Sequence, residues 1–222
     1  MTPAPVHATL DRRLVAPRFT VLDAVRAGEE WNFNCGPAAL AVVARLTPDE
    51  IRPHMGDFED KGYTNPTLMF ECLNRVGLSW KPRKATGPTD WHSDGLHVWP
   101  KFGLVRVQWE GPWTAPGVPI CVRYRHSHWI AVDSTIEGEE PNIFDVNCIC
   151  VGGWVPLSQW SASVVPWLLQ QCEPKASGAW HLAHVIEVNA PADARKQRHG
   201  SVMPLSHPER DGRRTPEAPK QK

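Results

Sequence analysis

Residues 34–46 read NCGPAALAVVARL. Pro37 suits the first turn of a helix because it has no amide hydrogen to lose there, and the apolar residues after it predict a buried helix. Cys35 then lies at the helix N-terminus, where the positive end of the macrodipole and the unpaired backbone N–H groups favour the thiolate. The thiolate is the form of cysteine that attacks a carbonyl carbon, so this stretch predicts a nucleophile that needs a base.

Length and charge set broad limits. The 222 residues fit one globular domain with a tail. There are 24 Lys and Arg residues and 24 Asp and Glu residues, so global charge gives no sign of a nucleic-acid or anionic-membrane partner. No run approaches the ~18 apolar residues of a membrane helix, and the first twenty residues lack the apolar core of a secretory signal. We therefore expect a cytoplasmic protein with reduced cysteines.

The order of helix and strand signals predicts an α+β fold. Helix starts are indicated by the capping box at Thr47-Pro48-Asp49-Glu50 and by Asn65-Pro66, the second helix ending at Gly77. Alternating apolar residues then predict strands at 103–109, 118–124, 128–133, 142–147 and 182–188. A further helix is expected at 158–172, kinked or split at Pro166.

Three segments follow from these patterns. Residues 1–17 carry many prolines and predict an extended N-terminal segment, and residues 18–189 hold the folded domain. Residues 190–222 are polar and rich in Pro, Lys and Arg, so we expect a disordered tail, or one ordered by a partner that its sequence does not identify.

The predicted base is His128, which enters the apolar strand Trp129-Ile130-Ala131-Val132. A rigid strand gives a general base the fixed geometry it needs. If residues 130–133 and 142–147 form a hairpin that turns near Gly138, Asp145 falls opposite His128 and can fix the imidazole tautomer. Asn147 projects to the same side and is the alternative residue to orient His128.

A carbonyl under attack also needs donors for its oxyanion. The backbone N–H of Cys35 is one. The second is expected from a side-chain amide just upstream, and Asn32 is preferred because Asn34 is placed to cap the helix instead.

The motifs around Cys35, His128 and Asp145 resemble the papain-like cysteine peptidase superfamily, and most closely its bacterial and phage peptidase C39-like branch. The similarity lies in Asn34-Cys35-Gly36-Pro37-Ala38-Ala39-Leu40, in Ser127-His128-Trp129-Ile130-Ala131-Val132 and in Ile143-Phe144-Asp145-Val146. It implies a papain-like fold, in which a helical part bearing Cys35 packs on a small antiparallel sheet bearing His128 and Asp145. One departure is that the family usually has a glutamine about six residues before the cysteine, where this chain has Glu29 and Glu30.

The resemblance implies a cysteine-dependent hydrolase that cleaves a peptide, isopeptide or amide bond through a Cys-His-Asp triad and an acyl-enzyme, with no cofactor. Its substrate is expected to be a peptide or protein. Two alternatives stay open: an acyl transferase or transglutaminase that uses the same triad, and a weakly active papain-like binding module. The latter fits a phage virion or a secretion-associated component, in which case the protein is virion-associated.

A zinc site is the competing interpretation of the same region. The side chains that could bind zinc are His126, His128, Cys148, Cys150, His181 and His184. Their spacings match no recognised zinc pattern. Phosphate-binding glycine loops are absent from the sequence, which argues against nucleotide-dependent chemistry.

Overall fold

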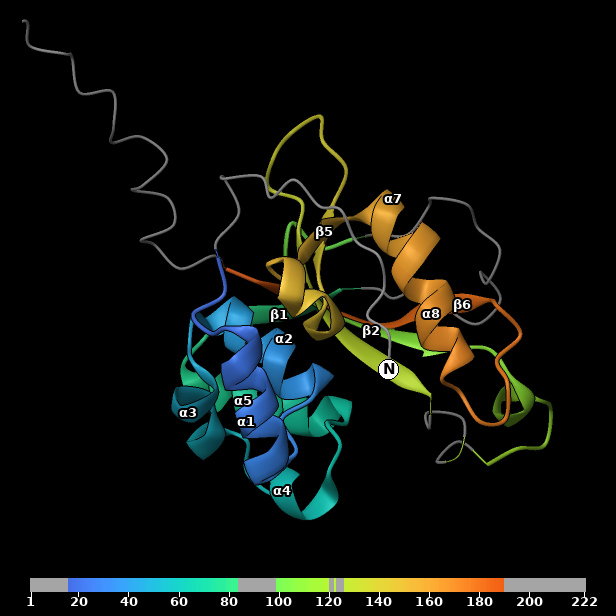
Figure 1. The fold of residues 1–222 in the computed structure, drawn as a ribbon, viewed down its shortest axis with the longest axis horizontal. Helices are drawn as coiled ribbons and strands as arrows, with labels where there is room; N and C mark the ends of the chain where they lie inside the picture. Colours follow the sequence, from blue (N-terminus) through green and yellow to red (C-terminus); the bar gives the residue numbers. More distant parts are fainter. Residues whose placement is uncertain (1–15, 84–98, 120–121, 123–125, 190–222) are drawn as a thin grey trace, which may run out of the picture. The chain divides into compact units, whose positions relative to one another are not determined.

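The computed structural model describes residues 16–83, 99–119, 122 and 126–189, which form a mixed fold of helices and one antiparallel sheet (Figure 1). The sheet order is β1-β6-β2-β3-β4-β5. Its strands are β1 (Trp80–Arg83), β2 (Phe102–Trp109), β3 (Ser127–Asp133), β4 (Asn142–Phe144), β5 (Trp154–Pro156) and β6 (Trp180–Val188). The α-helices are α1 (Val21–Trp31), α2 (Cys35–Ala44), α3 (Pro48–Ile51), α4 (Phe58–Lys61), α5 (Pro66–Val76), α7 (Leu157–Gln159) and α8 (Val165–Gln170).

Shorter helical segments connect these elements. The 3₁₀ turns are η1 (Arg52–His54), η3 (Pro112–Thr114) and η4 (Val146–Val151), and the π-helical segment η5 (Trp160–Val164) joins α7 to α8.

Helix ends in the first third follow the predicted capping residues. Thr47 and Glu50 form a reciprocal capping box at the start of α3. Asn65 caps α5 through the N–H of Leu68, and Gly77 ends that helix in the left-handed conformation. Side-chain caps satisfy N–H groups that a helix leaves unpaired, so these predicted boundaries are confirmed.

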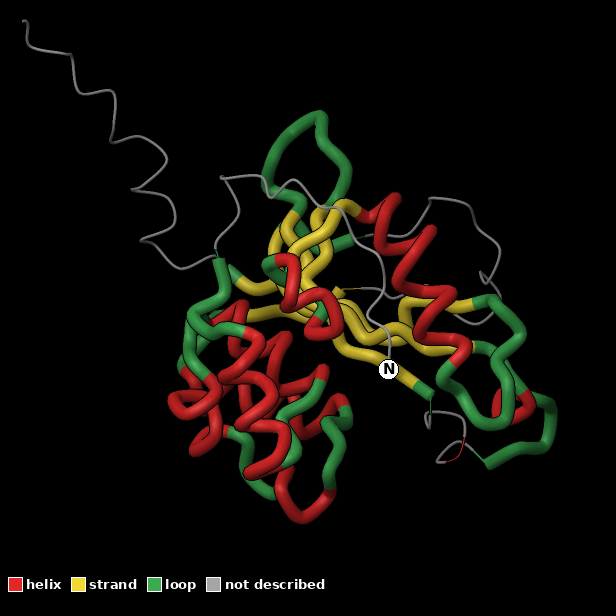
Figure 2. Tube along the Cα trace, viewed as in Figure 1, coloured by secondary structure: helices red, strands yellow, loops and turns green. Residues whose placement is uncertain are grey.

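The sheet separates two apolar cores because neighbouring strand residues point to opposite faces. On one face Leu104, Ala131 and Ile186 pack against the helices of the first third, including α2. On the other face Val105, Ile130 and other alternate residues pack against η5 and α8. Figures 1 and 2 show α1–α5 grouped on one side and α7 and α8 on the other.

Several predicted boundaries differ from the structure. The strand predicted at 142–147 ends at Phe144, because the chain turns into η4 from residue 146. Strands β1 and β5 were not predicted, since each is only three or four residues long and contains a proline. The helix predicted at 158–172 is not broken at Pro166. The π-helical segment η5 lies just before this proline, and α8 continues the helix through it.

Other predictions fall partly or wholly on residues that the structure leaves undescribed. Of the strand predicted at 118–124, Val118 and Pro119 lie in a loop and Val122 is helical, and the remaining residues are not described. The predicted N-terminal segment, apart from residues 16 and 17, and the predicted tail also lie outside the described residues.

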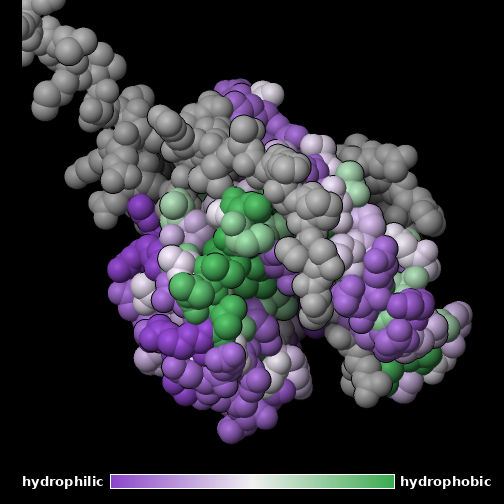
Figure 3. All heavy atoms as spheres, viewed as in Figure 1, coloured by the Kyte–Doolittle hydropathy of each residue, from purple (hydrophilic) through white to green (hydrophobic). Residues whose placement is uncertain are grey.

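The described surface over the helices is mainly hydrophilic, and Figure 3 shows its largest apolar patch near the centre of the view. Among the described residues, the large apolar side chains that stand exposed are Val21, Leu22, Val25 and Tyr63. Within the same residues, every helix is too short or too polar to cross a bilayer.

Candidate active site

Cys35 is the first residue of α2, as the sequence predicts. Asn34 caps this helix by accepting a hydrogen bond from the N–H of Gly36 at 3.3 Å, and its side-chain amide donates to the carbonyl of Gly62 at 3.2 Å. The N–H of Cys35 belongs to the first turn, where no helix carbonyl is available to accept it. The thiol therefore lies at the positive end of a buried helix, beside backbone donors.

A second contact fixes the start of α2 against the sheet. Trp129 of β3 donates its indole N–H to the carbonyl of Thr64 at 2.8 Å, and a Cβ built on Gly36 would overlap with the Thr64 hydroxyl. Only a residue without a side chain fits at position 36, so the Cys-Gly-Pro order has a steric cause in this fold.

His128 lies near the start of β3 and is 7% exposed. It pairs with Val107 of β2 on one side. On its other side β4 pairs with β3 only as far as Ala131, which faces Phe144. The edge of β3 is therefore open beside His128 and Trp129, and the Cys35 thiol is close enough to both residues for the charge of His128 and the backbone N–H of Trp129 to act on its pKa.

Asp145 follows β4 and is fully buried. Its Oδ2 accepts from the His128 ring at Nε2 and from the Trp160 indole at Nε1, each at 2.9 Å. Its Oδ1 accepts from Asn147 twice, from the backbone N–H at 2.9 Å and from the side-chain amide at 2.8 Å. Because Nε2 is bound to Asp145, Nδ1 is the ring nitrogen left to act on Cys35. The site thus combines a carboxylate, an imidazole and a thiol.

The route by which Asp145 reaches His128 differs from the predicted hairpin. The β3–β4 register pairs Ala131 with Phe144, and continuing it would put Asn147, not Asp145, opposite His128. The strand does not continue: Asp145 caps η4 and turns its carboxylate toward β3. The register prediction is therefore wrong, although Asp145 is the residue that contacts His128. Asn147, the predicted alternative, binds Asp145.

The charges at the site favour an ion pair. Burial by itself raises the pKa of the Cys35 thiol, but the charge and hydrogen bond of His128 and the N–H of Trp129 outweigh it and lower this pKa. Burial likewise opposes the charged form of His128, yet the charges of Asp145 and Cys35 raise its pKa well above the ordinary value. The pKa of Asp145 is lowered, because its contacts with His128, Trp160 and Asn147 outweigh its burial. Each of the three shifts favours the charged form of its group: thiolate, imidazolium and carboxylate.

Asn32, the predicted oxyanion donor, ends α1 in the left-handed conformation with φ of 61° and has an exposed side chain. Asparagine tolerates this conformation better than most residues. It stands three positions before Cys35, and the structure shows no bond that directs its amide at the thiol. Glu29 and Glu30, which occupy the position of the family's glutamine, are also exposed.

Sequence reasoning missed Trp160. The chain holds eleven tryptophans, and packing in the core explains most tryptophans in a protein of this size. Nothing in the spacing of residue 160 links it to Asp145, because the link depends on the path of η5 over the sheet. A buried indole that needs an acceptor was the only available signal.

The residues of the alternative zinc site do not assemble. Among the described residues, no three His, Cys, Asp or Glu side chains come close enough together to hold a metal ion. Nε2 of His128 is already bound to Asp145.

No family model fits the chain, and no curated sequence is significantly similar to it.

Proposed function

We propose that this protein is a papain-like cysteine hydrolase that cleaves a peptide, isopeptide or amide bond through Cys35, His128 and Asp145. The observation that carries the proposal is the hydrogen bond between His128 Nε2 and Asp145 Oδ2 at 2.9 Å, with the Cys35 thiol close enough for His128 to lower its pKa. The similarity of the three sequence motifs to C39-like peptidases supports it independently.

The reaction follows from the protonation states of the site. The Cys35 thiolate attacks the carbonyl carbon, a C–S bond forms, and the carbonyl oxygen takes the negative charge next to the N–H of Cys35. The imidazolium of His128 gives its proton to the departing amine as the C–N bond breaks, which leaves a thioester. Water then gives a proton to His128 and attacks the thioester carbon, and the acid product and the thiolate separate. Asp145 stabilises the imidazolium and sets its orientation throughout.

The position of Asn32 favours one alternative, a weakly active binding module. The Asn32 amide is exposed, so the backbone N–H of Cys35 is the oxyanion donor that lies at the thiol. Removing one such donor from a well-studied serine protease costs about 10²–10³ in rate, so a site with a single donor is expected to be slow.

A peptide mixture of broad composition tests the proposal, with Cys35→Ala as the matched control. We expect new peptide termini that appear only with the unmodified protein, together with a protein mass increased by an acyl group bound at Cys35 that hydroxylamine removes. Added amine that becomes incorporated into products identifies an acyl transferase. Absence of both termini and acyl-protein, in a sample whose Cys35 is reduced, contradicts the hydrolase proposal and leaves the binding module.

A further inference from the structure

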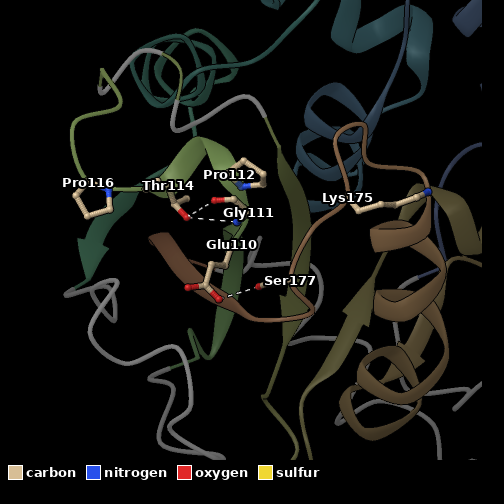
Figure 4. A pocket seen from close by; sticks show the side chains of 8 residues that line it. Glu110, Gly111, Pro112, Thr114, Pro116, Lys175 and Ser177 are labelled. Carbon is tan, nitrogen blue, oxygen red and sulfur yellow. Dashed lines mark hydrogen bonds between the residues drawn. The ribbon is translucent and has the colours of Figure 1, made fainter.

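A hollow of about 430 Å³ lies beyond the end of β2 (Figure 4). One part of its lining comes from the residues that follow β2, beginning with Glu110, and the other part comes from the loop before β6. Its lining residues are Glu110, Gly111, Pro112, Thr114, Ala115, Pro116, Lys175 and Ser177. It has room for one large side chain of a ligand.

The backbone beneath Glu110 is held on both sides. Its N–H donates to the carbonyl of Ala179 at 2.9 Å, and its carbonyl accepts from Ser177 at 2.9 Å. The Ser177 hydroxyl also donates to Glu110 Oε2 at 2.7 Å. The carboxylate is therefore fixed before any ligand arrives, which lowers the entropic cost of binding.

The other polar groups of the hollow are used within the protein. The Thr114 hydroxyl donates to the Gly111 carbonyl at 2.8 Å. Lys175 points away from Glu110 in Figure 4, and its ammonium binds the carbonyl of Gln170 at 2.7 Å and Glu173 at 3.2 Å. What remains for a ligand is the carboxylate of Glu110 beside the apolar surfaces of Pro112, Ala115 and Pro116.

We infer that this hollow is a subsite for a basic side chain, lysine or arginine, of the substrate. A fixed carboxylate pairs with the cationic head, and arginine can engage it with two parallel hydrogen bonds. The proline and alanine surfaces pack against the methylene stem of such a side chain. The inference rests on the proposed function, because it assigns the hollow to the substrate of Cys35.

The hollow lies along β2 from the position that pairs with His128. Glu110 follows β2 by one residue and stands three residues beyond Val107, the partner of His128 in the sheet. Three residues of a strand span about 10 Å, which equals three residues of an extended peptide. Glu110 continues the alternation of Leu104, which packs on the side of the sheet that α2 and its first residue Cys35 cover, whereas Val107 faces the other side.

Binding is tested first without catalysis, in the full chain with Cys35→Ala. The probes are acetyl-arginine amide and acetyl-citrulline amide, which have nearly the same shape but differ in charge. Their binding is measured by the NMR shifts of the Gly111 and Ser177 amides. We expect the arginine probe to bind about threefold to fivefold more tightly, as for an exposed ion pair, and 0.5 M NaCl to reduce the difference. Glu110→Gln should abolish the preference, whereas Glu137→Gln, an equal change of charge in the turn before β4, should keep it. Equal binding of both probes, or a preference that survives in Glu110→Gln, overturns the inference.

A directed alkylation then links the hollow to Cys35. Chloroacetyl-Gly-Gly-Arg amide and its citrulline counterpart carry the same electrophile, from which the Cys35 thiolate displaces chloride to form a thioether. We expect faster labelling of Cys35 by the arginine reagent and loss of this advantage in Glu110→Gln. Iodoacetamide separates the two proposals: failure to label Cys35 with it contradicts the proposed function, whereas normal labelling with no arginine advantage contradicts only the subsite.

Discussion

Trp160 and His128 donate hydrogen bonds to the same carboxylate oxygen, Asp145 Oδ2, each at 2.9 Å. With Asn147 on Oδ1, the fully buried carboxylate receives four hydrogen bonds. Such bonds stabilise the charged form and hold the oxygen that faces His128 in place. In the proposed mechanism Trp160 is thus a positioning residue for His128, although it lies far from Cys35 in the sequence and packs in the core on the opposite face of the sheet.

Trp160→Phe removes the indole donor and keeps most of the aromatic volume. We expect the free energy of unfolding to fall by about 1.5–3 kcal/mol, as for a hydrogen bond to a charged group. Turnover should also fall, and its alkaline limit should move to lower pH, because a less firmly held carboxylate raises the pKa of His128 less. Trp113→Phe is the matched control, since Trp113 donates to the carbonyl of Trp109 at 2.9 Å. It should lower stability without moving the pH profile, and an identical pH profile in both variants would refute the positioning role.

Asp145→Asn should lower turnover steeply, by as much as the ~10⁴ known for the best-studied serine triad, because the imidazole can then take the wrong tautomer. Asn147→Ala should cost much less, because the backbone N–H of residue 147 still binds Oδ1. Steady-state rates of both variants check this. A larger loss in Asn147→Ala would mean that Asn147 orients His128 directly and that the roles are exchanged.

His128→Ala should abolish turnover, and His126→Ala should not. His126 packs against Trp113, with 3.8 Å between ring centroids and 37° between the ring planes, and it is not part of the contact between His128 and Asp145. The two variants are compared by rate and by metal content. Equal losses, together with bound zinc, would replace the thiol mechanism with a metal site.

Gly36→Ala tests the packing at the start of α2. The new methyl group meets the Thr64 hydroxyl, and overpacking of this kind costs about 1–3 kcal/mol. Gly28→Ala in α1 is the control, because its nearest neighbour lies at an ordinary 3.6 Å and alanine is the better helix former. We expect a lower melting temperature for the first and an unchanged or higher one for the second. Thr64→Ala should restore part of the loss, and if Gly36→Ala is as stable as Gly28→Ala, the steric account is wrong.

Sequence patterns predicted those features that depend on local chemistry. Capping residues such as Asn34, Thr47 and Asn65 identify helix starts because their side chains bond within the next turn. The strand after His128 could be predicted because aromatic and β-branched residues such as Trp129, Ile130 and Val132 favour a strand, and they are buried on both of its faces. Asp145 was named by its distance along the chain, but its actual geometry depends on β4 stopping at Phe144. Trp160 could not be assigned, because its contact with Asp145 depends on how the chain folds through η4, β5 and α7, which lie between the two residues.

If Cys35 exists as a thiolate paired with the His128 imidazolium, the pH dependence of its alkylation reports this pair without any substrate. Limiting iodoacetamide is used from pH 4 to 10, with free N-acetylcysteine amide in the same sample as the reference thiol. Burial raises the pKa of Cys72 to about 11, so that thiol should stay unlabelled at neutral pH. The lowered pKa of Cys35 predicts labelling that rises at a lower pH than that of the reference thiol. In His128→Ala the charge that offsets burial is lost, and the Cys35 profile should move to higher pH. A Cys35 profile that rises together with that of the reference thiol, and is unchanged in His128→Ala, would contradict the thiolate–imidazolium pair.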